Sequence, residues 1–384
     1  MKNQVHPKFF FTRRERELAS LRELSARVGS DPLLVQASNG NTSIKLEGIL
    51  WIKGSGKWLA RANQEEVLIP IELGEAKETV EQGGEIAQRQ ISRNGMRPSI
   101  ETAMHAVLPH RVVIHVHSIN TIAWAIRSDG IEEVTARLGG LHWQWIPYAA
   151  SGIPLAREIE LAVARAKDTD VFILANHGLV VCGEDCAAAE ELLCEVERRL
   201  AISPRPFPMP DSAVLGHIAR FSGWQYPEYD SLHALGTDKA ALKILKGGVL
   251  YPCQAIFLGL EALTLAPTLA ASKLKARLTA GEAPSFVVVE RSGVMLNEKM
   301  TGAERATLIG LMEVVRRTKE SARLRYLTRE EVEKVVNEGG RGYRDEAETE
   351  ERANSATAGG DLRPGTPSRV HPQHALFMVA GERK

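Results

Sequence analysis

Two histidines, His115 and His117, interrupt a run of β-branched apolar residues, Val112-Val-Ile-His-Val-His-Ser118. This composition predicts a buried strand, because β-branched side chains favour a pleated sheet. Residues i and i+2 of a strand point to the same face, so both imidazoles are expected at one place. Buried polar groups need partners, and a metal ion with a nearby carboxylate supplies them. The run therefore predicts a metal site.

The third ligand is expected from His177. This residue follows the apolar run Val171–Ala175 and precedes Gly178, a position from which a side chain at a strand end reaches a shared site. Catalytic zinc sites commonly use three protein ligands and leave one position open. His115, His117 and His177 are therefore the predicted metal ligands.

Glu101 opens the predicted helix that comes just before the first histidine strand. A carboxylate beside a metal can act as a general base on a bound substrate. A glutamate in the first turn of a helix is also explained by the helix dipole alone. Both interpretations of Glu101 stay open at this point.

The composition restricts the class of protein. The 384 residues are 44% hydrophobic and carry a formal net charge of zero, which favours neither a nucleic-acid nor a membrane partner. The N-terminus is polar, without an apolar signal core, and the four cysteines show no paired framework. These features predict a cytoplasmic protein with reduced cysteines.

Composition shifts along the chain predict four parts. Residues 1–202 form the metal-binding domain, 203–210 a stiff proline-rich linker, 211–338 a second α/β domain, and 339–384 a polar tail that is disordered or loosely docked. In the first domain the predicted helices cover 8–29, 74–95, a stretch from Ser99, 119–128, 153–166 and 185–200, and the predicted strands 44–53 (a hairpin), 112–118, 143–146, 171–175 and 179–181.

Two loops rich in glycine, serine and asparagine bracket the predicted hairpin, at 37–43 and 54–58. Such loops can offer backbone N–H groups and hydroxyls to an anion. They are equally well explained as ordinary hairpin turns.

The second domain can be read as a copy of the first. Residues 251–260 can be aligned with 108–117, and 286–293 with 172–178. In that alignment the histidines are lost, so the copy keeps the fold and lacks the metal. An unrelated α/β extension is the alternative.

Together, these motifs resemble the class II aldolase/adducin family. The resemblance covers about residues 13–200 and rests on Gly40-Asn-Thr-Ser43, Lys53-Gly-Ser-Gly56, Pro98-Ser-Ile-Glu101, His115-Val-His-Ser118 and Asn176-His-Gly178. It implies an α/β/α layered fold around a mostly antiparallel sheet. It also implies a homo-oligomer, tetramer or dimer, with active sites at the subunit interfaces.

The resemblance assigns roles to individual residues. The three histidines would bind Zn²⁺ or another divalent metal, and Glu101 would be both the catalytic glutamate and a ligand of the resting metal. Tyr148 resembles a proton donor that reaches across the interface. The positions that match the substrate-phosphate site are Asn41, Ser55, Gly56 and Ser99.

The implied activity is that of a metal-dependent aldehyde-lyase, which cleaves a sugar, a ketose 1-phosphate, through an enediolate. A sugar-phosphate dehydratase, a decarboxylase, an epimerase and a noncatalytic adducin-like scaffold are the alternatives. Two features depart from the pattern. Ile100 stands where a second phosphate-loop serine is common, and 211–336 has no counterpart in the compact fuculose-phosphate aldolases but is similar to part of larger aldolase/dehydrogenase proteins.

Overall fold

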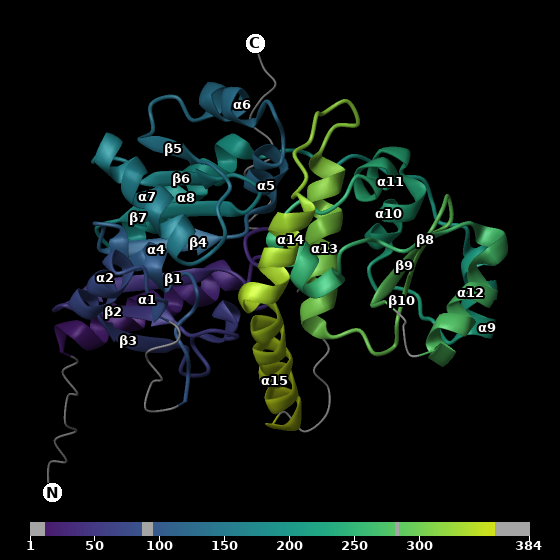
Figure 1. Ribbon diagram of the computed structural model, residues 1–384, viewed down its shortest axis with the longest axis horizontal. Coiled ribbons are helices and arrows are strands. Elements are labelled where there is room, and N and C mark those ends of the chain that lie inside the picture. The colour runs from purple at the N-terminus through teal and green to yellow at the C-terminus, as the bar shows by residue number, and fades with distance from the viewer. Residues whose placement is uncertain (1–11, 87–94, 281–283, 358–384) are drawn as a thin grey trace, which may run out of the picture.

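A seven-stranded sheet forms the centre of the first half of the chain in the computed structural model, which describes residues 12–86, 95–280 and 284–357 (Figure 1). Its strand order is β3-β2-β1-β4-β7-β6-β5, and every neighbouring pair is antiparallel except β5 and β6. The strands are β1 (Asn41–Leu46), β2 (Ile49–Lys53), β3 (Leu68–Glu72), β4 (Val112–Val116), β5 (Trp143–Ile146), β6 (Val171–Leu174) and β7 (Gly178–Gly183). The predicted α/β/α class with a mostly antiparallel sheet is confirmed.

Helices cover both faces of this sheet. The alternation along β4 shows the division, because Val112, Ile114 and Val116 enter one core and Val113 enters another. The first core is closed by α1 (Arg13–Gly29), α5 (Ile119–Ala125), α6 (Gly130–Arg137) and α8 (Cys186–Leu200), and the opposite face by α2 (Leu73–Glu81), α4 (Thr102–Val107) and α7 (Ile153–Arg165). A short 3-10 helix, η1 (Leu59–Arg61), packs on α1.

The second half of the chain contains a three-stranded sheet of order β10-β9-β8. Its elements are α9 (Ser212–Ser222), η2 (Asp230–His233), α10 (Ala234–Thr237), α11 (Lys239–Lys246), η3 (Gln254–Leu258), β8 (Thr264–Leu265), α12 (Pro267–Ala280), β9 (Phe286–Val289), β10 (Gly293–Leu296), α13 (Gly302–Arg317), α14 (Arg329–Val335), η4 (Val336–Gly340) and α15 (Arg341–Thr357). No helix among the described residues combines the length and the apolar character needed to cross a membrane.

Part of this half repeats the first half. β8 is parallel to β9 and β9 antiparallel to β10, as β5 is parallel to β6 and β6 antiparallel to β7. A helix joins the parallel pair in each case, and the two hairpins carry a residue of positive φ at matching positions, Asn176 (53°) and Arg291 (59°). The predicted match of 286–293 with 172–178 therefore fits the structure at the hairpin, although the strands make residue 171, not 172, the counterpart of 286. The alignment of 251–260 with 108–117 is wrong, because 254–258 forms a π-helical turn instead of a strand.

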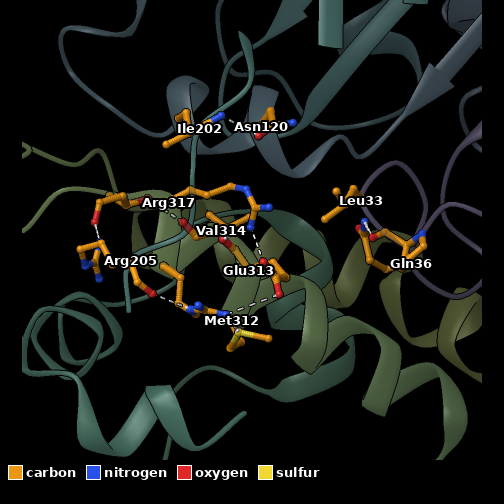
Figure 2. A network of polar contacts seen from close by, with 12 residues as sticks. Leu33, Gln36, Asn120, Ile202, Arg205, Met312, Glu313, Val314 and Arg317 are labelled. Atoms are coloured by element: carbon orange, nitrogen blue, oxygen red, sulfur yellow. Dashed lines mark hydrogen bonds and ion pairs between the residues drawn. The ribbon is translucent and has the colours of Figure 1, made fainter. Parts of the chain in front are cut away.

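The two halves share a hydrophobic core. Ile119, Ile122 and Ile126 of the first half pack in one cluster with Leu308 and Leu311 of α13. The proline-rich segment after α8 runs without regular structure along the end of α13, where the backbone N–H of Arg205 donates to the carbonyl of Arg316 and the carbonyl of Arg205 accepts from Arg316 Nε. Asn120 of the first half adds a further link, since its Oδ1 accepts the N–H of Ile202 at 3.1 Å (Figure 2). The segment is thus docked on the second half.

The expectation of a disordered tail is wrong for 341–357, which form α15. Its described apolar anchors are Tyr343 and Ala347, four residues apart on one face, and Tyr343 packs edge-on against Phe257 with ring centroids 5.8 Å apart. Residues 358–384 lie outside the described part of the chain. In Figure 1, α15 continues below α14 beside the β1–β3 edge of the large sheet.

Candidate metal centre

Four buried side chains, Glu101, His115, His117 and His177, converge at one point. One ligand atom of each lies within 4.8 Å of the others. The three imidazole rings stand edge to face, with centroids 5.1, 5.0 and 5.0 Å apart. The Glu101 Oε1 atom lies 3.1 Å from His177 Nε2 and 3.4 Å from His115 Nε2. The structure therefore brings together all four residues that were predicted to hold a metal.

The hydrogen bonds of His115 define which of its nitrogens is free. Nδ1 lies 3.0 Å from the carbonyl oxygen of Leu179, which can only accept, so Nδ1 carries the hydrogen. Nε2 is then directed at the Glu101 carboxylate and has no hydrogen-bond partner among the described residues. A nitrogen and a carboxylate that face each other in a buried site need a positive charge between them, and the set of three imidazoles and one carboxylate suits a divalent metal ion in that place.

His117 is prepared in a similar way. Its Nδ1 lies 3.4 Å from the Cys253 thiol, whose hydrogen is directed to Asn39 Oδ1 at 3.2 Å. The ring nitrogen is therefore the donor of this pair, and Nε2 is left with a free lone pair and no partner in the described residues. Burial lowers the pKa of His117 well below its ordinary value, which keeps the imidazole neutral and able to bind a metal.

The Glu101 carboxylate is fixed from two sides. Asn41 Nδ2 donates to Oε2 at 2.6 Å, and Ser151 Oγ donates to Oε1 at 3.2 Å. Burial by itself raises the pKa of this carboxyl, but the imidazoles of His115 and His177 reverse the effect and hold the pKa well below its ordinary value. Glu101 is thus an ionised, oriented group at the N-cap of α4.

Strand register explains why Asn41 reaches Glu101. Asn41 of β1 pairs directly with His115 of β4, so their side chains share one face of the sheet. His115 in turn pairs with Val180 of β7, the strand that follows the His177 turn.

The turn between β6 and β7 positions His177. Asn176 adopts the left-handed conformation, with φ 53°, and its Nδ2 donates to the carbonyls of Leu250 and Arg325 at 2.8 Å each. A Cβ atom on Gly178 would lie 2.4 Å from the carbonyl oxygen of Val116, so only glycine lets the turn approach β4 this closely. The sequence Asn-His-Gly therefore has a separate structural reason at each position.

The second half of the chain contributes to the site. Tyr343 of α15 donates its hydroxyl to Asn39 Oδ1 at 3.1 Å and accepts from Ser38 Oγ at 2.9 Å. Together with the Cys253 contact, these bonds connect α15 and the residue before η3 to His117 through Asn39. Neither residue was found from the sequence, because their sequence distance from Asn39 exceeds two hundred positions and no local pattern marks them.

Lys53 begins the Lys53-Gly-Ser-Gly56 motif, but the sequence assigned no role to it. It is fully enclosed, and its Nζ donates to the carbonyls of Ser38 at 2.6 Å and Lys57 at 2.8 Å. Burial lowers its pKa to about 7, while the charge of Glu101 acts in the opposite direction. Lys53 joins the 38–39 segment to the loop after β2.

The four expected phosphate ligands separate into two pairs. Asn41 and Ser99 both contact Glu101, the latter by accepting its backbone N–H at 3.3 Å. Ser55 and Gly56 lie in the loop after β2 and contact Glu346 of α15. The isoleucine at position 100 lies 3.3 Å from where a Gly152 Cβ would stand and 3.5 Å from the corresponding position at Gly339. Ile100 therefore lies between the turn before α7 and the break before α15.

Tyr148 is not brought to the four ligands. Its ring packs with Val249, Leu327 and Val332, and the guanidinium of Arg325 lies 4.8 Å above it. Burial raises its pKa to about 12. Its hydroxyl is enclosed and has no hydrogen-bond partner among the described residues.

The fold and the four converging side chains define an α/β/α domain with a buried Glu/His group that could hold a metal ion. Residues 20–203 match the family described as the Class II Aldolase and Adducin N-terminal domain. The match confirms the resemblance that the motifs predict for this part of the chain.

One curated relative is the "Uncharacterized oxidoreductase YuxG" of Bacillus subtilis (strain 168). It is 28% identical over 173 residues, which make up 41% of this chain and 25% of the relative. The match thus spans about a quarter of that relative's length.

Solved structures of the same class are also similar. The N-terminal class II aldolase domain of a conserved protein from Thermoplasma acidophilum is 24% identical, covers 52% of this chain and 97% of its own, and has a TM-score of 0.42. The l-fuculose-1-phosphate aldolase from Thermus thermophilus is 19% identical, covers 48% and 91%, and has a TM-score of 0.35.

Proposed function

We propose that the protein is a metal-dependent aldehyde-lyase that cleaves a carbon–carbon bond in a sugar, a ketose 1-phosphate. The observation that carries this proposal is the pairing of an ionised, fixed carboxylate with buried imidazole nitrogens that have no other partner in the described residues. His115, His117, His177 and Glu101 would hold the metal, and a set of three imidazoles and one carboxylate suits Zn²⁺. A divalent ion there supplies Lewis acidity, which favours the negative charge that develops beside a substrate carbonyl.

The chain's own residues supply the proton chemistry. Cleavage removes a proton from one hydroxyl, which becomes the carbonyl of the released aldehyde, and leaves an electron pair on the carbon beside the substrate's carbonyl. That carbon must then take up a proton. Glu101 is the residue we assign to the transfer, since Asn41 and Ser151 orient its two oxygens and the site is buried. Tyr148 stays a proposed proton donor, although its contacts lie with the second half of the chain.

A panel of substrates tests the proposal. Zinc-loaded protein is incubated with ketose 1-phosphates, with their unphosphorylated counterparts and with 3-oxo-tetronate phosphates. Release of dihydroxyacetone phosphate is the expected result. Carbon dioxide would indicate a decarboxylase, loss of water a dehydratase, and altered stereochemistry at unchanged mass an epimerase. If the purified protein neither contains nor takes up a divalent ion, the noncatalytic scaffold gains support over an enzyme.

A further inference from the structure

The loop after β2 gathers groups that bind anions. Lys57 Nζ lies 2.7 Å from a carboxylate oxygen of Glu350, and Arg97 Nη1 lies 3.7 Å from Glu346. The Ser55 hydroxyl donates to the other oxygen of Glu346. Gly56, with φ +73°, adjoins this glutamate so closely that a Cβ atom there would lie 3.2 Å from its Cβ. Arg97 belongs to the segment before α4, whose backbone accepts the N–H of Ser55. We call Ser55, Gly56 and Lys57, together with this neighbouring Arg97, the anion loop.

The anion loop adjoins the metal centre. Lys53 bonds to the carbonyl of Lys57 and to that of Ser38, and Asn39 next to Ser38 accepts from Tyr343 and from the thiol that contacts His117. A molecule that reached both Glu101 with the three histidines and the anion loop would therefore meet Glu346 and Glu350 of α15.

The carboxylates of α15 occupy the loop's cationic groups. A carboxylate carries one negative charge and two acceptor oxygens, whereas a phosphate monoester carries between one and a half and two charges and three terminal oxygens. One phosphate group can therefore contact both cations and the hydroxyl at once, whereas Glu350 contacts Lys57 alone and Glu346 contacts only Arg97 and Ser55. Glu346 and Glu350 are in this respect weak substitutes for the group that the loop is built to hold.

α15 is attached in a way that permits it to leave. Its described apolar anchors are few, mainly the buried Ala347 and the partly buried Tyr343, and most of its other side chains are charged. The chain before it departs from helical geometry at Glu338 (φ −97°, ψ 48°) and Gly339 (φ 121°, ψ −23°). A helix held largely by partly exposed ion pairs and preceded by such a break is only weakly fixed.

We propose that Lys57 and Arg97 bind the phosphate of the substrate, and that α15 closes this site with Glu346 and Glu350 until a phosphate-bearing ligand displaces it. The inference deepens the proposed function and rests on it for the identity of the ligand. It also accounts for the isoleucine at position 100, since this apolar side chain contacts the break before α15 at Gly339.

The test measures the binding of inorganic phosphate to the full-length, zinc-loaded protein by calorimetry. The double variant Glu346→Gln/Glu350→Gln is expected to bind phosphate about tenfold more tightly than the wild type, because two competing ion pairs are lost. Asp345→Asn is the matched control, as Asp345 is an exposed acid on the same helix. Lys57→Met and Arg97→Gln are each expected to weaken binding about fivefold or more. Arg97 is exposed, so its variant keeps the fold if Lys57→Met does not.

Hydrogen exchange supplies a second measurement. Saturating phosphate is expected to speed amide exchange in 341–352 of the wild type, and slower exchange there would overturn the displacement. Equal affinities for the double variant and Asp345→Asn would overturn the role of the two glutamates. Phosphate binding unaffected by Arg97→Gln and by Lys57→Met would place the anion elsewhere, for instance at the metal. None of these measurements needs turnover, so an inactive protein that still shows displacement would refute the proposed function alone.

Discussion

Glu197 makes the stability of the protein depend on pH in a defined direction. Its Oε2 accepts from Asn120 at 3.0 Å, while Oε1 is enclosed without a hydrogen-bond partner in the described residues. Burial raises the pKa of this carboxyl from an ordinary 4.5 to about 7, although Ser118 and Asn120 act against the rise. The perturbation is Glu197→Gln, which keeps the shape and removes the ionisation.

The size of the effect follows from the two pKa values. Below pH 4.5 the carboxyl is protonated in both the folded and the unfolded chain, so its burial does not lower the free energy of unfolding. Between 4.5 and about 7 the unfolded chain releases its proton first, so the folded state loses stability as pH rises. One pKa unit corresponds to about 1.4 kcal/mol, which gives a total of roughly 3 kcal/mol. The glutamine variant avoids this loss.

The assay compares urea unfolding of metal-loaded wild type and variant at pH 5 and pH 8 by tryptophan fluorescence. We expect the difference in the free energy of unfolding, Glu197→Gln minus wild type, to be about 2–3 kcal/mol larger at pH 8 than at pH 5. Glu191→Gln, an exposed position on the same helix, is the control and should show no such difference. A difference between Glu197→Gln and wild type that is the same at both pH values would refute the reasoning.

Three other outcomes are expected. Glu101→Gln should keep the circular dichroism spectrum of the wild type and lose turnover by about a hundredfold or more, as for a general base, and unchanged turnover would remove Glu101 from that role. Added zinc should raise the melting temperature of the wild type, and should do so much less in His177→Ala, because a cation that binds only the folded chain stabilises it; equal shifts in calorimetry would contradict the ligand assignment. Asn176→Ala should lower the free energy of unfolding by about 2–4 kcal/mol, since two buried carbonyls lose their donor and alanine is strained at positive φ. Urea titration of that variant within about 0.5 kcal/mol of wild type would argue against this interpretation.

The metal centre can be predicted from the sequence because local patterns indicate its residues. Strand periodicity places His115 and His117 on one face, and the glycine after His177 signals a close approach that the structure confirms. The same reasoning fails for 251–260, where an apolar run typical of a strand forms a helical turn within a shared core. A segment that is buried on all sides lacks the hydrophobic periodicity that would distinguish a strand from a helix.

The contribution of α15 could not be predicted from the sequence for a different reason. The sequence of α15 is highly charged, which is typical of disordered segments, and its two apolar anchors carry little signal. What orders it is a set of carboxylates that meet Lys57, Arg97 and the N-terminus of α13, where Glu351 accepts the N–H of Gly302 at 2.7 Å. Such pairings depend on tertiary structure and cannot be predicted from one chain's local pattern.

The turn at 176–178 joins two equilibria. Asn176 donates to carbonyls of the second half of the chain, and the next residue, His177, belongs to the group that we propose to hold the metal, so ordering of this turn would favour both docking of the halves and binding of the ion. Thermodynamic linkage then requires reciprocity: whatever free energy the ion adds to docking, docking returns to the affinity for the ion. A chelator should consequently loosen contacts far from the histidines, and any change that separates the halves should release the metal.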